Sequence, residues 1–180
     1  MELRTLRKRI WASAICALLL SAQPLAAQNH QHDFDFEFGA WKAQVSRLVH
    51  PLSGSHTWVD YDGTSVVRKI WGGRANLGEL EVDGAGGHLE GLTLRLYDPH
   101  TQLWSIRFSN GIDGKLSVAS VGRFENGRGE FFDREIINGR SVSVRFVFLD
   151  VTPASFHVEQ SFSPDGGKTW EKNWIATFTR

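Results

Sequence analysis

Four charged side chains in the second half of the chain have the types needed for acid–base chemistry. Glu159 or His157 has the chemistry of a proton-transfer group, and Arg95 or Arg145 that of a cation that stabilises developing negative charge. All four project from the less apolar side of their predicted strands. If that side faces solvent, these residues form surface ion pairs, each worth less than about 1 kcal/mol. Both interpretations, an enzyme and an inert outer surface, stay open at this point.

Two histidines and a carboxylate lie close together in the run Asn29-His-Gln-His-Asp33. Histidine is the commonest metal ligand, but a flexible polar lead-in explains this run more simply, and we predict no metal site. The sequence also has no Gly-rich phosphate loop, no dinucleotide fingerprint and no Gly-x-Ser-x-Gly elbow. We therefore predict a domain without a cofactor.

The first 27 residues have the three parts of a secretory signal peptide. Four basic residues within positions 4–9 precede an apolar stretch over 10–22, and the small-residue end is Pro24-Leu-Ala-Ala27. The apolar stretch is shorter than the roughly 20 residues that span a bilayer, so we expect no stable membrane anchor. We predict cleavage after Ala27, a periplasmic or secreted location, and a single domain over residues 28–180.

The composition of the mature domain excludes several function classes. The full chain has 20 basic and 20 acidic residues, and removing the leader's four basic and one acidic residue leaves 16 against 19. This slightly negative balance argues against nucleic acid as a partner. The only cysteine, Cys16, lies in the leader, so a disulfide framework and a catalytic thiol are not expected.

Turn signals recur from Phe36 onward at spacings of about eight to twelve residues, which is typical of antiparallel sheets. They lie at 61–63, 72–73, 83–87, 98–100, 110–114, 126–127, 138–139, 150–153 and 165–167. Long helical periodicity is absent. A meander of this length must close on itself or leave two exposed edges, and closure removes the edges. We predict an all-β, antiparallel up-and-down barrel of about nine or ten strands, with a sandwich as the alternative.

Folding the predicted hairpins at these turns tests whether the apolar side chains share one face. The residues that share it are Leu94, Trp104, Phe108, Val144, Phe146, Val158, Gln160, Lys172 and Trp174. Arg95, which follows Leu94, then lies on the other face. The stretch 130–137 does not fit, because pairing at the turns on either side places Phe131 and Phe132 on conflicting faces. We therefore expect a β-bulge there.

Gly39-Ala-Trp41 lies on the first predicted strand, and the last apolar strand closes with Arg180. This arrangement resembles the calycin (lipocalin-like) pattern, in which an indole at the closed end of the barrel packs under an arginine. The chain also resembles, over essentially the whole mature part, an uncharacterised bacterial family of calycin-like β-barrel proteins, a domain of unknown function. The other runs that carry this resemblance are Phe34-Asp-Phe36, Leu94-Arg-Leu-Tyr-Asp-Pro99, Glu159-Gln160 and Ser163-Pro-Asp-Gly-Gly-Lys-Thr-Trp-Glu-Lys-Asn-Trp174. The resemblance implies a barrel and contact between Trp41 and Arg180, and it supplies no established reaction.

From these observations we predict a barrel that binds a small, largely apolar molecule in its lumen. The residues expected to line the lumen are Trp41, Leu94, Trp104, Phe108, Phe146, Val158, Gln160, Lys172 and Trp174, the polar Gln160 and Lys172 orienting the ligand. One alternative is a cofactor-independent hydrolase, isomerase or cyclase that uses Glu159 or His157 with Arg95 or Arg145. The other is a packed structural barrel or an interaction module with exposed aromatic residues. The choice depends on which face of the strands points inward.

Overall fold

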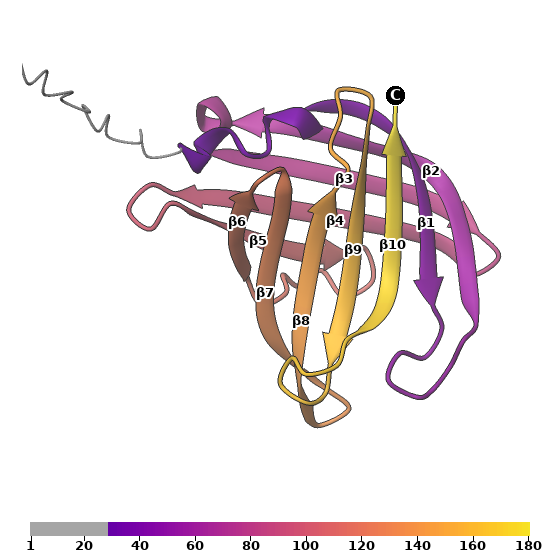
Figure 1. The fold of residues 1–180 in the computed structure, drawn as a ribbon. Helices are drawn as coiled ribbons and strands as arrows, with labels where there is room; N and C mark the ends of the chain where they lie inside the picture. Colours follow the sequence, from indigo (N-terminus) through magenta and orange to yellow (C-terminus); the bar gives the residue numbers. More distant parts are fainter. Residues whose placement is uncertain (1–28) are drawn as a thin grey trace, which may run out of the picture.

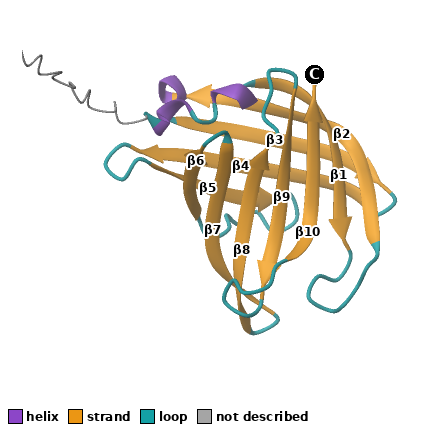
Figure 2. Ribbon diagram, viewed as in Figure 1, coloured by secondary structure: helices purple, strands orange, loops and turns teal. Residues whose placement is uncertain are grey.

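Ten stretches in which buried and exposed residues alternate form strands, and the strands close into one barrel (Figure 1). The computed structural model describes residues 29–180, so the signal peptide predicted for residues 1–27 lies outside the described residues. Each strand pairs antiparallel with its neighbours in sequence, and β1 pairs with β10. Strands dominate the described chain (Figure 2). The structure confirms an all-β, up-and-down, calycin-like barrel and excludes the sandwich.

Three short 3-10 helices, written η, accompany the strands. The elements are η1 (His30–His32), η2 (Asp35–Glu37), β1 (Gly39–Leu48), β2 (Trp58–Ile70), η3 (Trp71–Gly73), β3 (Ala75–Gly84), β4 (Gly87–Asp98), β5 (Leu103–Asn110), β6 (Ser120–Glu125), β7 (Arg128–Ile137), β8 (Arg140–Leu149), β9 (Ser155–Ser163) and β10 (Glu171–Thr179). The predicted turn signals lie between strands, with one exception. The turn predicted at 61–63 is wrong, because these residues lie inside β2. Gly63 instead permits a close approach of β3, since a Cβ there would overlap the carbonyl oxygen of Glu81.

The register between β4 and β5 differs by one residue from the prediction, which placed Leu94 on the same face as Trp104 and Phe108. Arg95 pairs with Ile106, whereas Leu94 pairs with Arg107. Four residues, 99–102, separate the two strands, and Gln102 adopts a positive φ of 57°. Because a shift of one residue exchanges the two faces of a strand, Arg95 points into the barrel and Leu94 points outward.

A second correction concerns the bulge. The β7 ladders run without a register shift, so the bulge predicted over 130–137 is wrong. Phe132 simply faces outward, where its ring lies 6.3 Å from that of Trp170. The irregularity lies instead in β10, between Lys172 and Trp174. It turns the side chain of Lys172 outward while Trp174 keeps its place on the inner face beside Gln160.

One end of the barrel, the closed end, is filled by the N-terminal segment, residues 29–38. Phe34 is fully buried and makes edge contacts with Trp104, Phe124 and Phe148 on three different strands. The segment is also tied to the barrel by hydrogen bonds, because the indole Nε1 of Trp104 donates to the His30 carbonyl at 2.7 Å. The first residues of the described chain therefore belong to the core.

The contact predicted between Trp41 and Arg180 is confirmed. The Arg180 guanidinium carbon lies 3.7 Å from the centroid of the Trp41 ring. Trp41 Nε1 donates to the Glu37 carbonyl at 2.7 Å, and Arg180 Nη2 donates to the Phe36 carbonyl at 2.9 Å. Trp41 on β1 and the C-terminal Arg180 thus meet at the closed end, where each also donates a hydrogen bond to the N-terminal segment.

Candidate functional site: the barrel lumen

The inner face is the side of the strands that carries Trp41, Trp104 and Phe131, which belong to one buried core. Toward the end opposite the N-terminal segment, the open end, the inner face is unevenly covered: Tyr61, Val82 and Val144 are buried there, whereas other apolar residues are not. Inner-face apolar residues there that keep part of their surface exposed are Val59, Leu80, Leu89, Phe108, Phe146 and Trp174. These side chains point into the barrel and yet are not completely covered by it.

The residues predicted to line the lumen fall into three groups. Those that lie on the inner face and keep some exposure are Phe108, Phe146, Val158, Gln160 and Trp174. Trp41 and Trp104 also point inward, but they are buried at the closed end. Leu94 and Lys172 point outward, so their prediction as lumen residues is wrong. The causes are the one-residue register difference at the β4–β5 turn and the bulge in β10.

Two small residues face each other on β3 and β4 between the two ends. Gly78 pairs with Thr93 on the inner face, one step toward the open end from the pair Asn76 and Arg95. A Cβ added to Gly78 would meet Arg95 Nη1 at 3.4 Å and Thr93 Cβ at 3.8 Å, which are ordinary contact distances. Position 78 therefore has space for a methyl group just below Arg95.

A buried ion pair forms the roof of the lumen, where the N-terminal segment meets the barrel. Arg95 Nη1 lies 2.8 Å from Glu37 Oε2, and Arg95 Nη2 donates to Glu37 Oε1 at 3.3 Å. Arg95 Nη1 also donates to the Asn76 Oδ1 at 3.0 Å. Burial raises the pKa of Glu37 to about 6, although the charge of Arg95 opposes this shift. Burial likewise lowers the pKa of Arg95.

Two carboxyl groups project from the inner face of β7 nearer the open end. Asp133 accepts a hydrogen bond from the Ser120 hydroxyl, and Glu135 lies two residues further along the strand. Burial raises the pKa of Asp133, and burial together with the charge of Asp133 raises the pKa of Glu135. These groups give the inner face hydrogen-bond acceptors on β7, three strands from Trp174 on β10.

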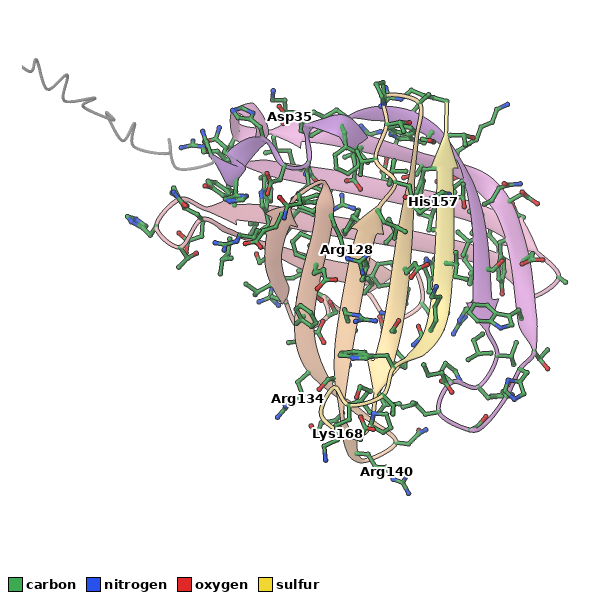
Figure 3. The ribbon with its side chains drawn as sticks, viewed as in Figure 1. Asp35, Arg128, Arg134, Arg140, His157 and Lys168 are labelled. Atoms are coloured by element: carbon green, nitrogen blue, oxygen red, sulfur yellow. The ribbon has the colours of Figure 1, made fainter. Side chains whose placement is uncertain are left out.

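The residues predicted for catalysis lie on both sides of the barrel wall. On the outer face, Nδ1 of His157, which is labelled in Figure 3, lies 3.2 Å from Asp150 Oδ2. Glu159 Oε1, on the same face, accepts from Lys172 Nζ at 2.6 Å. Arg145 is also outside, with its guanidinium carbon 4.4 Å from the centroid of the Trp170 ring. Only Arg95 points inward. A site that combines Glu159 or His157 with Arg95 is therefore ruled out, because the barrel wall separates them.

The N-terminal histidines serve the packing of the segment. His30 is buried, with Nδ1 2.9 Å from Asp33 Oδ2, and His32 Nδ1 lies 2.9 Å from Asp35 Oδ2. Asp33 also accepts from the Phe124 amide at 3.1 Å. Among residues 29–180, no group of three or more histidine, cysteine, aspartate or glutamate side chains is arranged to hold a metal ion. Within the same range, no helix is long and apolar enough to cross a membrane.

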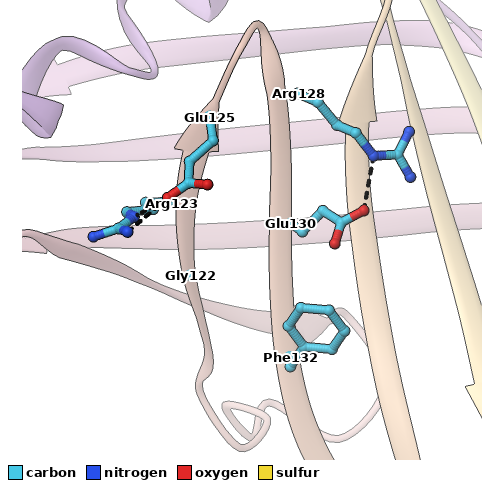
Figure 4. Close-up of a pocket in the computed structure, with 6 residues that line it drawn as sticks. All are labelled: Gly122, Arg123, Glu125, Arg128, Glu130 and Phe132. Atoms are coloured by element: carbon cyan, nitrogen blue, oxygen red, sulfur yellow. Dashed lines mark hydrogen bonds and ion pairs between the residues drawn. The ribbon is translucent and has the colours of Figure 1, made fainter. Parts of the chain in front are cut away.

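A hollow of about 370 Å³ lies on the outer face of β6 and β7 (Figure 4). Arg123 and Glu125 form one ion pair along β6, and Arg128 and Glu130 form another along β7. Phe132 lines the same hollow. Because the four charged groups are paired with one another, this hollow offers no free charge to a ligand. The lumen is the stronger candidate site.

Sequence reasoning missed Glu37, Asn76 and Asp133, which supply the polar groups of the lumen. Glu37 did carry a signal, since it is a carboxylate between Phe36 and Phe38 in a strongly apolar run. Asn76 and Asp133 carried none, because a polar residue on a strand is ordinarily assigned to the solvent face.

Comparisons with known proteins support the fold. No family model matches the sequence, and no curated protein matches it. The S-type phycobiliprotein lyase CPES from Guillardia theta has a similar structure, with a TM-score of 0.56 at 11% identity, covering 86% of this chain and 93% of the lyase. The protein EF1p2_mFAP2b, solved bound to DFHBI, gives a TM-score of 0.46 at 7% identity, covering 84% of this chain and 98% of its own. At such low identity, the likeness to the lyase shows a shared calycin-like barrel fold alone.

Proposed function

We propose that this protein binds one small, largely apolar molecule in the open half of its lumen. The observation that carries the proposal is the partial exposure of apolar side chains that point inward, above all Phe108 at 38% and the half-buried Trp174 and Phe146. Barrels of about this size are either filled by their own side chains or hold one small ligand. Apolar surface that faces inward without being buried favours the second case.

In this proposal the two halves of the lumen have different roles. The aromatic residues around Phe34 give the barrel a stable, packed base. The open half supplies apolar walls together with a few polar groups, among them Gln160, Asp133 and Glu135. An apolar pocket with a small number of polar groups is the usual composition of a small-molecule site.

A titration with the neutral, environment-sensitive dye Nile red tests the proposal. We expect saturable binding with a stoichiometry of about one dye per chain. Trp174→Ala should weaken binding by about fivefold or more, since it removes inward-facing apolar surface. Trp71→Ala is the matched control, because Trp71 is 67% exposed on η3 and belongs to the outer surface.

The rival interpretations give different results in the same titration. A barrel filled by its own side chains would show no saturable binding. An interaction module would bind the dye on its outer face, for example at the neighbouring Val121 and Phe132, which form a cross-strand pair. In that case Phe132→Ala would weaken binding and Trp174→Ala would not.

We also propose that the protein acts outside the cytoplasm. This rests on the three-part leader over residues 1–27. Intact-mass measurement of exported protein should give a chain that begins at Gln28, whereas a chain that retains Cys16 would contradict the proposal.

A further inference from the structure

The roof of the lumen has more hydrogen-bond donors than acceptors. Arg95 and Asn76 are both more than nine-tenths buried on the inner face. Among the described residues, Arg95 Nε and Asn76 Nδ2 have no hydrogen-bond partner. Glu37 Oε2 likewise accepts no hydrogen bond there, but it is in ion-pair contact with Arg95 Nη1 at 2.8 Å. A buried donor without an acceptor is costly, and such groups are uncommon in native proteins. Arg95 Nε and Asn76 Nδ2 therefore need hydrogen-bond acceptors that the described residues do not provide.

The geometry of the guanidinium group shows which of its edges is free. Glu37 bridges Nη1 and Nη2 at the end of the group, and Asn76 Oδ1 accepts from Nη1 on one side. Of the five N–H donors of an arginine, this leaves those on Nε and on the far side of Nη2. These two point the same way, so they form a fork on the side opposite Asn76. Because Asn76 lies on β3, the free fork points away from β3.

The charge of Arg95 is already balanced by Glu37. A second anion next to this pair would place two negative groups beside one positive group in a buried site, which is unfavourable. An uncharged acceptor such as a carbonyl oxygen would satisfy the free fork without that cost. The charges at the roof therefore favour a neutral ligand group over a carboxylate.

Two buried rings lie beside the Arg95 guanidinium, and part-exposed inner-face residues follow them. The centroid of the Phe34 ring is 5.0 Å from the guanidinium carbon. The Arg95 guanidinium carbon lies 5.7 Å from the ring centroid of Phe148. Two neighbours of Phe148 keep part of their surface exposed. They are Phe146, two residues earlier on β8, and Val158, which pairs with Phe148 across β8 and β9. A ligand that enters from the open end and packs on Phe146 and Val158 would bring its leading group to the edge of the roof.

We infer that the free edge of Arg95 recognises a neutral carbonyl group at the leading end of an otherwise apolar ligand. This inference rests on the proposed function, and it specifies the class of ligand as an apolar ketone, ester or amide. Arg95 is a binding residue in this account, and Glu37 sets its preference for an uncharged group.

Competition against bound Nile red with ligands that differ only in their leading group tests the inference. The competitors are decane, 2-decanone, decanoate and decylammonium. At about pH 7.5, where Glu37 is ionised, we expect 2-decanone to compete about tenfold better than decane and better than either ion. Arg95→Lys keeps a positive charge for Glu37 but lacks the fork, so the advantage of the ketone should fall below about twofold. Arg107→Lys, a change of the same kind on the outer face of β5, should leave it unchanged.

Glu37→Gln provides a second test that does not depend on the folding of the Arg95 variant. It removes the balancing charge, so the preference should shift from 2-decanone toward decanoate by about tenfold. Three outcomes would each overturn the inference: equal competition by decane and 2-decanone, a preference for decanoate in the unmodified protein, or no shift in Glu37→Gln. In each case saturable Nile red binding would still support a lumen site. Absence of saturable Nile red binding would overturn the proposed function itself.

Discussion

The two ends of the barrel are built from the same strands and yet differ in how their inner faces are covered. At the closed end, Phe34 and Glu37 of the N-terminal segment fill the space between the strands and are almost completely buried. At the open end, Phe108 and Trp174 also point inward, but they keep part of their surface exposed, and no segment of residues 29–180 buries them as completely. An inward direction therefore does not by itself make a side chain part of a packed core. The difference comes from the chain segment that is placed over the closed end.

The largest expected effect compares one tryptophan from each end. Trp41→Ala should reduce the free energy of unfolding by about 3–5 kcal/mol, because it removes a buried ring and its contact with Arg180. Trp174→Ala should cost less than about half of that, since Trp174 is only half-buried. Urea unfolding of the two variants measures both values. Similar losses at the two sites would show that the ends are equally packed, and a loss below about 1 kcal/mol for Trp41 would indicate an exposed indole.

Two glycines give the next comparison. Gly63→Ala should destabilise the protein by up to about 3 kcal/mol, because the new methyl group would overlap the backbone of β3 at Glu81. Gly78→Ala should change stability by less than about 1 kcal/mol, since its methyl group would make ordinary contacts beneath Arg95. Thermal unfolding of the two variants tests this. A large loss for Gly78→Ala would mean that the space beneath the roof is already filled.

The buried carboxyl group of Glu37 gives the closed end an unusual pH dependence. Because its pKa is raised to about 6 in the folded protein, the folded state binds this proton more tightly than the unfolded state does. The contribution of Glu37 to stability should be fully present below about pH 4.5 and decrease by about 2 kcal/mol as the pH rises through 6.

The measurement is the difference in unfolding free energy between the unmodified protein and Glu37→Gln, followed from pH 4.5 to 7. The raised pKa values of Asp133 and Glu135 act in the same direction, but they are present in both proteins and cancel in the difference. A difference that does not vary with pH would show that Glu37 is not buried as described.

The smallest expected effect concerns the arginine over Trp41. Arg180→Ala should cost about 1 kcal/mol through loss of the cation–π contact and of the hydrogen bond to the Phe36 carbonyl. Arg134, an exposed arginine on β7 toward the open end (Figure 3), is the control, and its change to alanine should cost less than about 0.5 kcal/mol. Equal values in a denaturant titration would remove the special role given to Arg180.

Much of the architecture could be predicted without coordinates, because it depends on local signals. Asn126-Gly127 and Asn138-Gly139 end strands where they were expected to, since asparagine and glycine adopt the positive φ that tight hairpins require. The contact between Trp41 and Arg180 also followed from the resemblance to calycins. Part of the candidate site was found in the same way, because Phe146 and Trp174 lie on strands whose inner face is apolar.

The remaining features needed the tertiary structure. The sequence alone determined that the chain forms a meander of strands with two kinds of face, because side-chain alternation and turn chemistry are local properties. The direction of Arg95 was decided by the β4–β5 register, and that of Lys172 by a bulge in β10, since one residue of difference exchanges inside and outside. The burial of Glu37 was decided by a contact with Arg95, 58 residues away in sequence. Only the closed barrel brings the N-terminal segment and β4 together, so no local pattern could show that this carboxylate meets an arginine inside the lumen.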